Sequence, residues 1–233
     1  MKPAWLYDEF KKVGVDFEDL ARVETYDRNQ TVSTPEKEKA LVARLGIAPG
    51  QTVIDLGAGT GTFAIQAALA GASVYAVDVS NVMLTYAQNK AQKMGTSSIA
   101  FHRAGFLTYE HPGSPANIVV TKNALHILPD FWKMAAFLRM ATLLQPGGKL
   151  YLRDVIFSFP PAAYEAAIDE WIAQVAQPFG QGWTAEDFRT HVREEYSTFS
   201  WIVEAMLTRA GLKILESNYP SPTYAEYLCV KEI

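Results

Sequence analysis

Apolar runs and amphipathic helical stretches alternate between residues 35 and 158. The apolar runs predict five strands, at residues 52–55, 73–78, 99–101, 116–121 and 149–157. Helical patterns separate or precede most of them, at residues 35–45, 63–70, 81–94 and 130–144. Strands joined through helices need crossover connections, which make the strands parallel and place helices on both faces of the sheet. We therefore predict an α/β fold with a doubly wound, mainly parallel sheet.

The pattern changes on both sides of this core, residues 35–158. Residues 1–34 mix charged and aromatic side chains and predict an N-terminal helical arm or lid. Residues 159–201 predict a helical cap inserted over the strand ends, and residues 202–233 predict a helix and a strand hairpin that complete the core. The expected elements are helices around 166–175, from the cap residue Thr184 to about Arg193, and from Ser197 or Thr198 to near Gly211, then antiparallel strands at 212–219 and 224–230.

Composition restricts the partners and the location of the protein. The 233 residues include 21 basic and 25 acidic side chains, a net charge of −4, whereas a nucleic-acid surface normally needs a basic stripe. The single cysteine, Cys229, excludes an intrachain disulfide and a cysteine-rich zinc site. No signal-peptide run and no apolar stretch of about 18 residues is present. We predict a cytoplasmic monomer or homodimer with no membrane span and no nucleic-acid partner.

A glycine-rich turn, Gly57-Ala58-Gly59-Thr60-Gly61, follows the first predicted strand. Glycines between a strand and its helix let the backbone approach a ligand beyond the carboxyl ends of the strands. In a dinucleotide fingerprint the third glycine would come one position later, where this chain has Thr62. Asp55, two residues before the first glycine, suits a cationic or amine-bearing ligand. Asp78 ends the second strand, where a carboxylate can accept both hydroxyls of a ribose.

In these features the sequence resembles the class I S-adenosylmethionine-dependent methyltransferases. The resemblance covers about residues 35–158 and the C-terminal hairpin, and is closest to the small-molecule branch that includes the quinone-biosynthesis enzymes. It implies a Rossmann-like seven-stranded sheet whose last strand is antiparallel. The motifs that carry it are Asp55–Gly61, Asp78, Asn123-Ala124-Leu125-His126-Ile127-Leu128-Pro129-Asp130, and Leu144-Gln145-Pro146-Gly147-Gly148-Lys149-Leu150.

The resemblance also implies a set of positions that bind S-adenosylmethionine, with S-adenosylhomocysteine as product. The glycine turn would lie against the methionine part, Asp55 would orient its amino end, and Asp78 would hold the ribose. One departure concerns the adenine, because the family often has Gly-Asp after the third strand where this chain has Gly105-Phe106. The implied cofactor-binding residues are Asp55, Gly57, Ala58, Gly59, Gly61, Asp78, Val79, Met83, Gly105, Phe106, Asn123 and Ala124.

A sulfonium methyl group is already activated, so an enzyme of this class mainly aligns donor and acceptor. A base helps only where the acceptor must lose a proton. His126 and Asp154 face the strand ends and are the candidate catalytic residues, although each also suits a packing or capping role. His191, Glu194, Glu195 and Tyr196 fit a solvated helix face better than a substrate contact. Tyr26 suits a lid over the cofactor or simple packing, and no residue set suggests a metal.

Several functions remain open at this stage. The first hypothesis is an enzyme that moves a methyl group to a small organic acceptor by in-line displacement. The acceptor atom can be oxygen, nitrogen, carbon or sulfur. The alternative is a non-catalytic S-adenosylmethionine-binding or sensing protein of the same fold. Residues 159–201 carry nine of the 28 aromatic residues and a local charge of −5, so the remainder is near neutral at +1. We expect this acidic, aromatic cap to select the acceptor and to disfavour polyanions.

Overall fold

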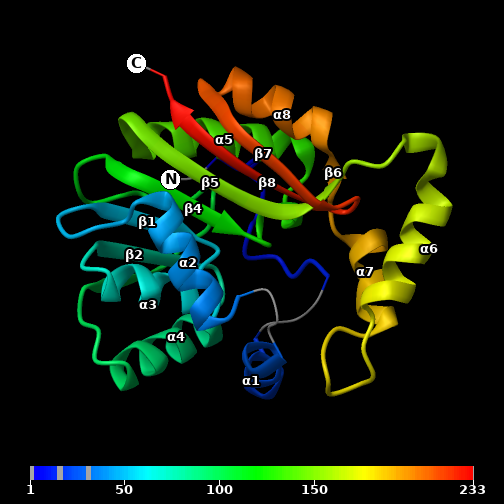
Figure 1. The fold of residues 1–233 in the computed structure, drawn as a ribbon, viewed down its shortest axis with the longest axis horizontal. Coiled ribbons are helices and arrows are strands. Elements are labelled where there is room, and N and C mark those ends of the chain that lie inside the picture. The colour runs from blue at the N-terminus through cyan, green and yellow to red at the C-terminus, as the bar shows by residue number, and fades with distance from the viewer. Residues whose placement is uncertain (1–2, 15–17, 30–32, 233) are drawn as a thin grey trace.

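A sheet of eight strands forms the centre of the molecule, with seven of them in one continuous order (Figure 1). The computed structural model describes residues 3–14, 18–29 and 33–232, so parts of the predicted arm lie outside the described residues. Seven strands follow the order β3-β2-β1-β4-β5-β8-β7, which confirms the predicted doubly wound, mainly parallel sheet. The strands are β1 (Thr52–Leu56), β2 (Ser73–Asp78), β3 (Ile99–Arg103), β4 (Ala116–Lys122), β5 (Leu144–Phe157), β7 (Leu212–Ser221) and β8 (Tyr224–Lys231).

Five of these strands, β1 to β5, run parallel, and the last strand runs against its neighbours. β8 pairs antiparallel with β5 on one side and with β7 on the other. Because a hairpin needs only a short turn, β7 and β8 close the sheet without another helix. The predicted antiparallel last strand and the predicted C-terminal hairpin are both confirmed.

Helices cover both faces of the sheet. Apolar residues of α2 (Pro35–Leu45) and α3 (Thr62–Leu69) pack with Val53 and Val120 on one face. On the other face α5 (Asp130–Leu143) and α8 (Ser200–Arg209) pack against Leu150 and Leu152. Parallel strands buried on both sides explain why β1 and β4 read as almost continuous apolar runs.

Local signals in the sequence set several helix ends as expected. The Thr34 side chain accepts from the Lys37 N–H at the start of α2, and Gly46 ends that helix in the left-handed conformation. Ser80 caps α4 (Asn81–Lys93) through the Met83 N–H. Thr184 and Asp187 form a reciprocal capping box at the start of α7 (Ala185–Glu194).

Most predicted element boundaries lie within two residues of the observed ones, and the clearest differences are at the start of β5 and before α8. β5 begins at Leu144 instead of 149, because Leu144 pairs with Ala116 ahead of an irregular stretch in the register. Neither Ser197 nor Thr198 caps α8. Instead Thr198–Phe199 forms a short strand, β6, beside β5, and the Thr198 hydroxyl donates to Asp130. Contacts from distant parts of the chain therefore outweighed a local capping signal.

The cap consists of α6 (Tyr164–Val175) and α7, which stand beyond the carboxyl ends of the strands (Figure 1). Trp171 and Phe188 pack on Val155 of β5, which confirms that the Trp171 helix contributes ordinary core. Helix α1 (Leu20–Asn29) bridges cap and core. Arg22 pairs with Asp187 of the cap at 2.9 Å, and Asp27 pairs with Lys90 of α4 at 2.7 Å.

The strand order reverses between β1 and β4, so the chain leaves these neighbours in opposite directions. This brings the turn after β1 against the turn after β4. A Cβ placed on Gly57 would stand 2.4 Å from the Ala124 Cβ, whereas a Cβ on Gly59 would meet nothing within 4 Å. Both glycines have positive φ, 75° and 51°. Gly57 is therefore required by packing, and Gly59 leaves an open surface.

No helix within the described residues is long and apolar enough to cross a membrane.

We predict that Gly57→Ala destabilises the fold more than Gly59→Ala. Both substitutions introduce strain from a positive φ, worth about 1 kcal/mol. Gly57→Ala also creates a steric clash, which adds roughly 1–3 kcal/mol. Urea unfolding monitored by circular dichroism measures both losses, and equal losses for the two variants would contradict the packing role of Gly57.

Candidate functional site

The glycine turn is held by backbone contacts to the neighbouring strand. The N–H groups of Gly57 and Ala58 both donate to the carbonyl oxygen of Val77, at 2.8 and 3.0 Å. Gly61 ends the turn where α3 approaches Ala87 of α4. The Gly59 N–H donates to Asp78 at 2.9 Å. The turn and the end of β2 therefore form one rigid unit.

Asp78 presents its carboxylate at the carboxyl end of β2. Its two oxygens accept from the backbone N–H groups of Gly59 and Ser80, each at 2.9 Å. Burial raises the pKa of Asp78 above its usual value, and these N–H donors partly offset the shift. Carboxylate oxygens retain further lone pairs, so Asp78 can still accept from a ligand hydroxyl.

Asp55 is buried near the end of β1. Desolvation raises the pKa of its carboxyl group to about 7, even though the Lys122 ammonium favours the charged form. Glu38 of α2 is also buried and pairs with Lys122. A ligand ammonium close to Asp55 would stabilise its ionised form.

The loop after β3 is covered by a residue that the sequence analysis did not single out. Glu9, from the N-terminal arm, is buried against Gly105 and accepts from the Leu107 N–H at 2.9 Å. Phe106 is buried beside the Gly57 turn. A carboxylate therefore lies beside the Gly105-Phe106 segment after all, but it comes from a segment distant in sequence. No local motif marks Glu9 as such a residue.

Two further predicted positions lie next to Asp78. The Val79 carbonyl oxygen accepts from the Arg103 side chain at 3.2 Å. The Met83 side chain is buried in the first turn of α4. Val79 therefore lies directly after β2, and Met83 lies in the following helix.

Asn123 follows β4 in the left-handed conformation, with φ of 51°, the one non-glycine residue with positive φ among the described residues. Its N–H donates to the Arg153 carbonyl oxygen at 2.7 Å, and its side-chain oxygen accepts from the Arg153 guanidinium. Asparagine tolerates this conformation better than most residues. The bend presses Ala124 against Gly57 and turns the chain toward His126.

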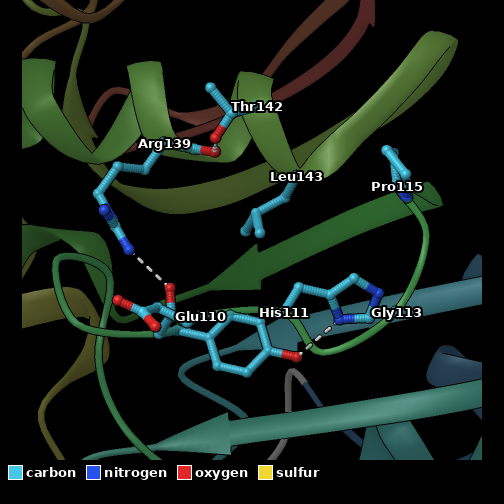
Figure 2. A pocket seen from close by; sticks show the side chains of 8 residues that line it. Glu110, His111, Gly113, Pro115, Arg139, Thr142 and Leu143 are labelled. Atoms are coloured by element: carbon cyan, nitrogen blue, oxygen red, sulfur yellow. Dashed lines mark hydrogen bonds between the residues drawn. The ribbon is translucent and has the colours of Figure 1, made fainter.

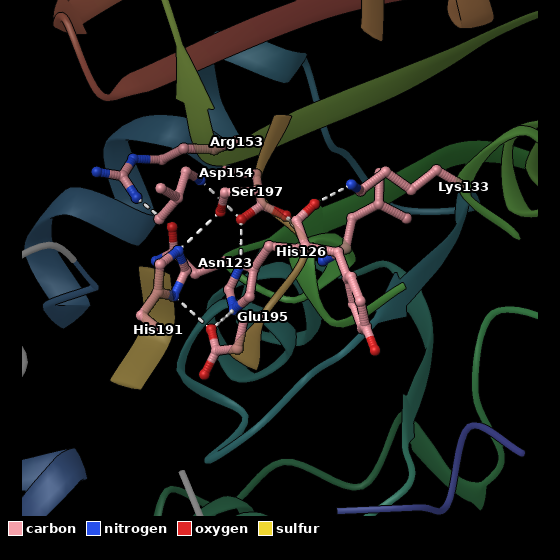
Figure 3. A network of polar contacts seen from close by, with 11 residues as sticks. Asn123, His126, Lys133, Arg153, Asp154, His191, Glu195 and Ser197 are labelled. Carbon is pink, nitrogen blue, oxygen red and sulfur yellow. Dashed lines mark hydrogen bonds and ion pairs between the residues drawn. The ribbon is translucent and has the colours of Figure 1, made fainter. Parts of the chain in front are cut away.

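The two candidate catalytic residues are in direct contact (Figure 3). His126 Nδ1 lies 2.5 Å from Asp154 Oδ1, and Asp154 Oδ2 accepts from the N–H groups of Leu125 and His126. Burial lowers the pKa of His126, but Asp154 and Glu195 outweigh it and hold that pKa above its usual value. Burial raises the pKa of Asp154, but His126 and the backbone donors hold it below its usual value.

The cap reaches this pair, contrary to the expected solvated helix face. Glu195 Oε2 lies 3.3 Å from His126 Nε2 and also contacts His191 Nδ1. His191 is buried, and its Nε2 lies 2.7 Å from the Ser197 hydroxyl. The Tyr196 N–H donates to the His126 carbonyl oxygen at 2.8 Å. The helical periodicity of α7 could not show that its C-terminal end lies close to the loop after β4. Glu194, in contrast, is exposed to solvent as expected.

Tyr26 of α1 lies between Asp78, at the end of β2, and Trp183 of the cap. Its ring lies edge-on to Trp183 at 6.0 Å between centroids. Burial, together with the nearby carboxylates of Asp78 and Asp27, raises the pKa of Tyr26. Helix α1 therefore places Tyr26 close to Asp78 at the end of β2 and against Trp183 of the cap.

Two cavities differ in their relation to these residues. One, of about 290 Å³, lies at the amino end of β4 between His111 and Arg139 (Figure 2), far from the glycine turn. The other, of about 380 Å³, is lined by Lys122, Asn123 and Arg153 together with residues of α2 and β8 such as Leu41 and Glu226. Asn123 is the one predicted site residue in its lining, so this cavity borders the predicted site without containing it.

We predict that Asp55→Asn stabilises the ligand-free protein above neutral pH. Since the pKa of about 7 in the folded protein exceeds the value of 3.8 in a free chain, this carboxyl lowers stability as pH rises from about 4 to about 7. The melting temperature of the variant should match the wild type near pH 4 and exceed it by about 5 °C near pH 8. Asp169→Asn, on the exposed face of α6, is the control. A constant difference across pH would contradict a raised pKa.

Comparisons with known proteins identify the family of this chain. A family model described as a methyltransferase domain matches residues 53–148. An uncharacterized methyltransferase of Anoxybacillus flavithermus is 32% identical over 165 residues, which cover 71% of this chain and 71% of that protein. The 27-O-demethylrifamycin SV methyltransferase of Amycolatopsis mediterranei is 28% identical over 160 residues, covering 66% and 56%.

A solved structure shares the fold. The magnesium protoporphyrin IX methyltransferase of Synechocystis PCC 6803, crystallised with bound S-adenosylmethionine, matches with a TM-score of 0.62 and 20% identity, over 96% of this chain and 88% of that one. The sheet order, the glycine turn and the sequence relatives lead to one conclusion. The chain belongs to the class I S-adenosylmethionine-dependent methyltransferases.

Proposed function

We propose that the protein transfers the methyl group to a hydroxyl of a small organic molecule. The observation that carries this proposal is the contact between His126 and Asp154 at the carboxyl ends of β4 and β5. A hydroxyl must lose its proton when its oxygen takes a methyl group, and a histidine oriented by a carboxylate can accept that proton. The relative that methylates a demethylrifamycin is named for transfer to an oxygen, which supports this choice.

The proton would move to Nε2 of His126. Asp154 occupies Nδ1 and fixes the orientation of the ring. Nε2 faces Glu195, at 3.3 Å, so an acceptor oxygen would take the place that this carboxylate now fills. Movement of the cap end that carries Glu195 would admit the acceptor.

The cofactor would lie across the glycine turn and the ends of β1, β2 and β4. When bound, S-adenosylmethionine supplies an activated methyl group on sulfur, and the protein supplies alignment. Asp78 would accept the ribose hydroxyls, Asp55 would face the amino end, and the open surface at Gly59 would let the ligand approach the backbone. Phe106 would pack on the adenine.

The remaining predicted positions have supporting geometry. Ala58 belongs to the Gly57 turn that would face the methionine part, and Gly61 is the N-cap residue of α3. Val79 and Met83 would flank the adenine, with Gly105 beneath it. Asn123 and Ala124 would pass beside the sulfonium, because their turn contacts Gly57.

The cap would choose the acceptor. Helices α6 and α7 stand over the carboxyl edge, and their aromatic cluster around Trp171 and Phe188 borders β5. The local charge of −5 disfavours polyanions. A small, neutral or weakly cationic hydroxyl compound fits these properties.

We predict that Asp78→Ala weakens S-adenosylmethionine binding at least about tenfold, the effect of losing charge-assisted hydrogen bonds. Isothermal titration calorimetry measures the affinity, with Asp169→Ala as the exposed control. S-adenosylhomocysteine should bind the wild type and NAD should not. An unchanged affinity in Asp78→Ala would rule out the ribose contact.

We predict that His126→Asn and Asp154→Asn lower kcat for a hydroxyl acceptor by about 10²-fold or more, as expected when a general base is removed. The affinity for S-adenosylmethionine should change little, because neither residue faces the glycine turn. Transfer of a radiolabelled methyl group to a panel of small phenols, alcohols and amines identifies the acceptor first. A wild-type rate in His126→Asn with a hydroxyl acceptor would overturn the base role.

A further inference from the structure

Three side chains from the core and the cap meet at one point beyond β4 and β5 (Figure 3). His126 comes from the loop after β4, whereas His191 and Glu195 come from the C-terminal end of α7. One ligand atom from each lies within 4.8 Å of the others. We propose that His126, His191 and Glu195 form a binding site for a divalent transition-metal ion such as Zn²⁺.

The orientation of both imidazoles supports a metal site. His126 has Nδ1 occupied by Asp154, and His191 has Nε2 occupied by the Ser197 hydroxyl. The other nitrogen of each ring points to the same atom, Glu195 Oε2. Histidines that bind metals are commonly oriented in this way, with the second nitrogen held by a carboxylate or another polar group.

The donor set also suits such an ion. Two imidazole nitrogens and one carboxylate are preferred ligands of Zn²⁺, and three protein ligands leave a position for water or another oxygen. The three side chains are only 14%, 11% and 7% exposed. Asp154 and Glu195 bring two carboxylates into this enclosed place, and a divalent cation would balance their charge.

A metal ion at this point would connect two parts of the molecule. His191 lies in the last turn of α7 and Glu195 is the extended residue that ends the helix. Their side chains are already in contact, so one ion can bind both. His126 belongs to the core. The ion would therefore fasten the cap over the carboxyl edge of the sheet, in addition to the contacts of the apolar cluster around Trp171.

The metal site is a property beyond the proposed methyl transfer, and metal binding is measured separately from methyl-transfer activity. The ion would occupy His126 Nε2, the same nitrogen that receives the proton in the proposed reaction. Metal binding and base catalysis therefore exclude one another in a single molecule. Absence of metal binding would leave methyl transfer by the metal-free protein intact.

The experiment uses the full chain after removal of metals with a chelator. Zn²⁺ binding is measured by isothermal titration calorimetry at neutral pH, and Co²⁺ is added as a spectroscopic probe of the ligand geometry. We expect one ion per chain, an absorption spectrum of imidazole- and carboxylate-bound Co²⁺, and a higher melting temperature with Zn²⁺. His191→Ala and Glu195→Gln should each weaken Zn²⁺ binding at least about tenfold.

Two matched controls keep the experiment decisive. His111→Ala removes a histidine that lies beside Tyr75 and Tyr109, away from the cluster, and should leave Zn²⁺ affinity unchanged. Glu194→Gln changes the neighbouring exposed acid. Retained S-adenosylmethionine binding shows that each variant is folded. The proposal is overturned if the wild type binds neither ion, or if His191→Ala and Glu195→Gln bind Zn²⁺ as tightly as the wild type.

Discussion

The close approach of two backbone turns is the constraint on which the site depends. Gly57 follows β1 and Ala124 follows β4, and a side chain on Gly57 would leave 2.4 Å between carbon atoms. The chain leaves these neighbouring strands in opposite directions, and the two turns meet at the same edge of the sheet. The result is a surface of backbone groups at Gly59, with Asp78 on one side and Asn123 on the other.

Several buried ionisable side chains lie at this edge of the sheet, and their protonation states differ. Asp55, at the end of β1, holds a carboxyl group with a raised pKa of about 7 because of desolvation. Asp154, at β5, holds its charge because His126 and backbone N–H groups bind it. The same type of side chain therefore has two protonation behaviours within one site, set by its partners.

The arm and the cap convert this edge into an enclosed site. Helix α1 contacts the core through Asp27 and the cap through Arg22. Glu9, also from the arm, packs against Gly105 and accepts a hydrogen bond from the Leu107 N–H. The cap contributes Glu195 directly beside His126. In the proposed function, the residues that select and admit an acceptor therefore come from the segments flanking the core.

The sequence by itself determined the alternation of strands and helices, the parallel sheet, the helix caps at Thr34, Ser80 and Thr184, and the glycine turn. These features depend on neighbours within a few residues, so local periodicity and capping chemistry are sufficient to predict them. The nearness of His126 and Asp154 could be predicted in outline, because the loop after β4 and the C-terminal part of β5 lie at the same edge of the sheet. The sequence could not predict the contacts of Glu9, His191 and Glu195, because no local pattern indicates which distant loop a polar side chain will contact. Only the tertiary structure decided these contacts, because they arise where the arm and α7 pack on the core.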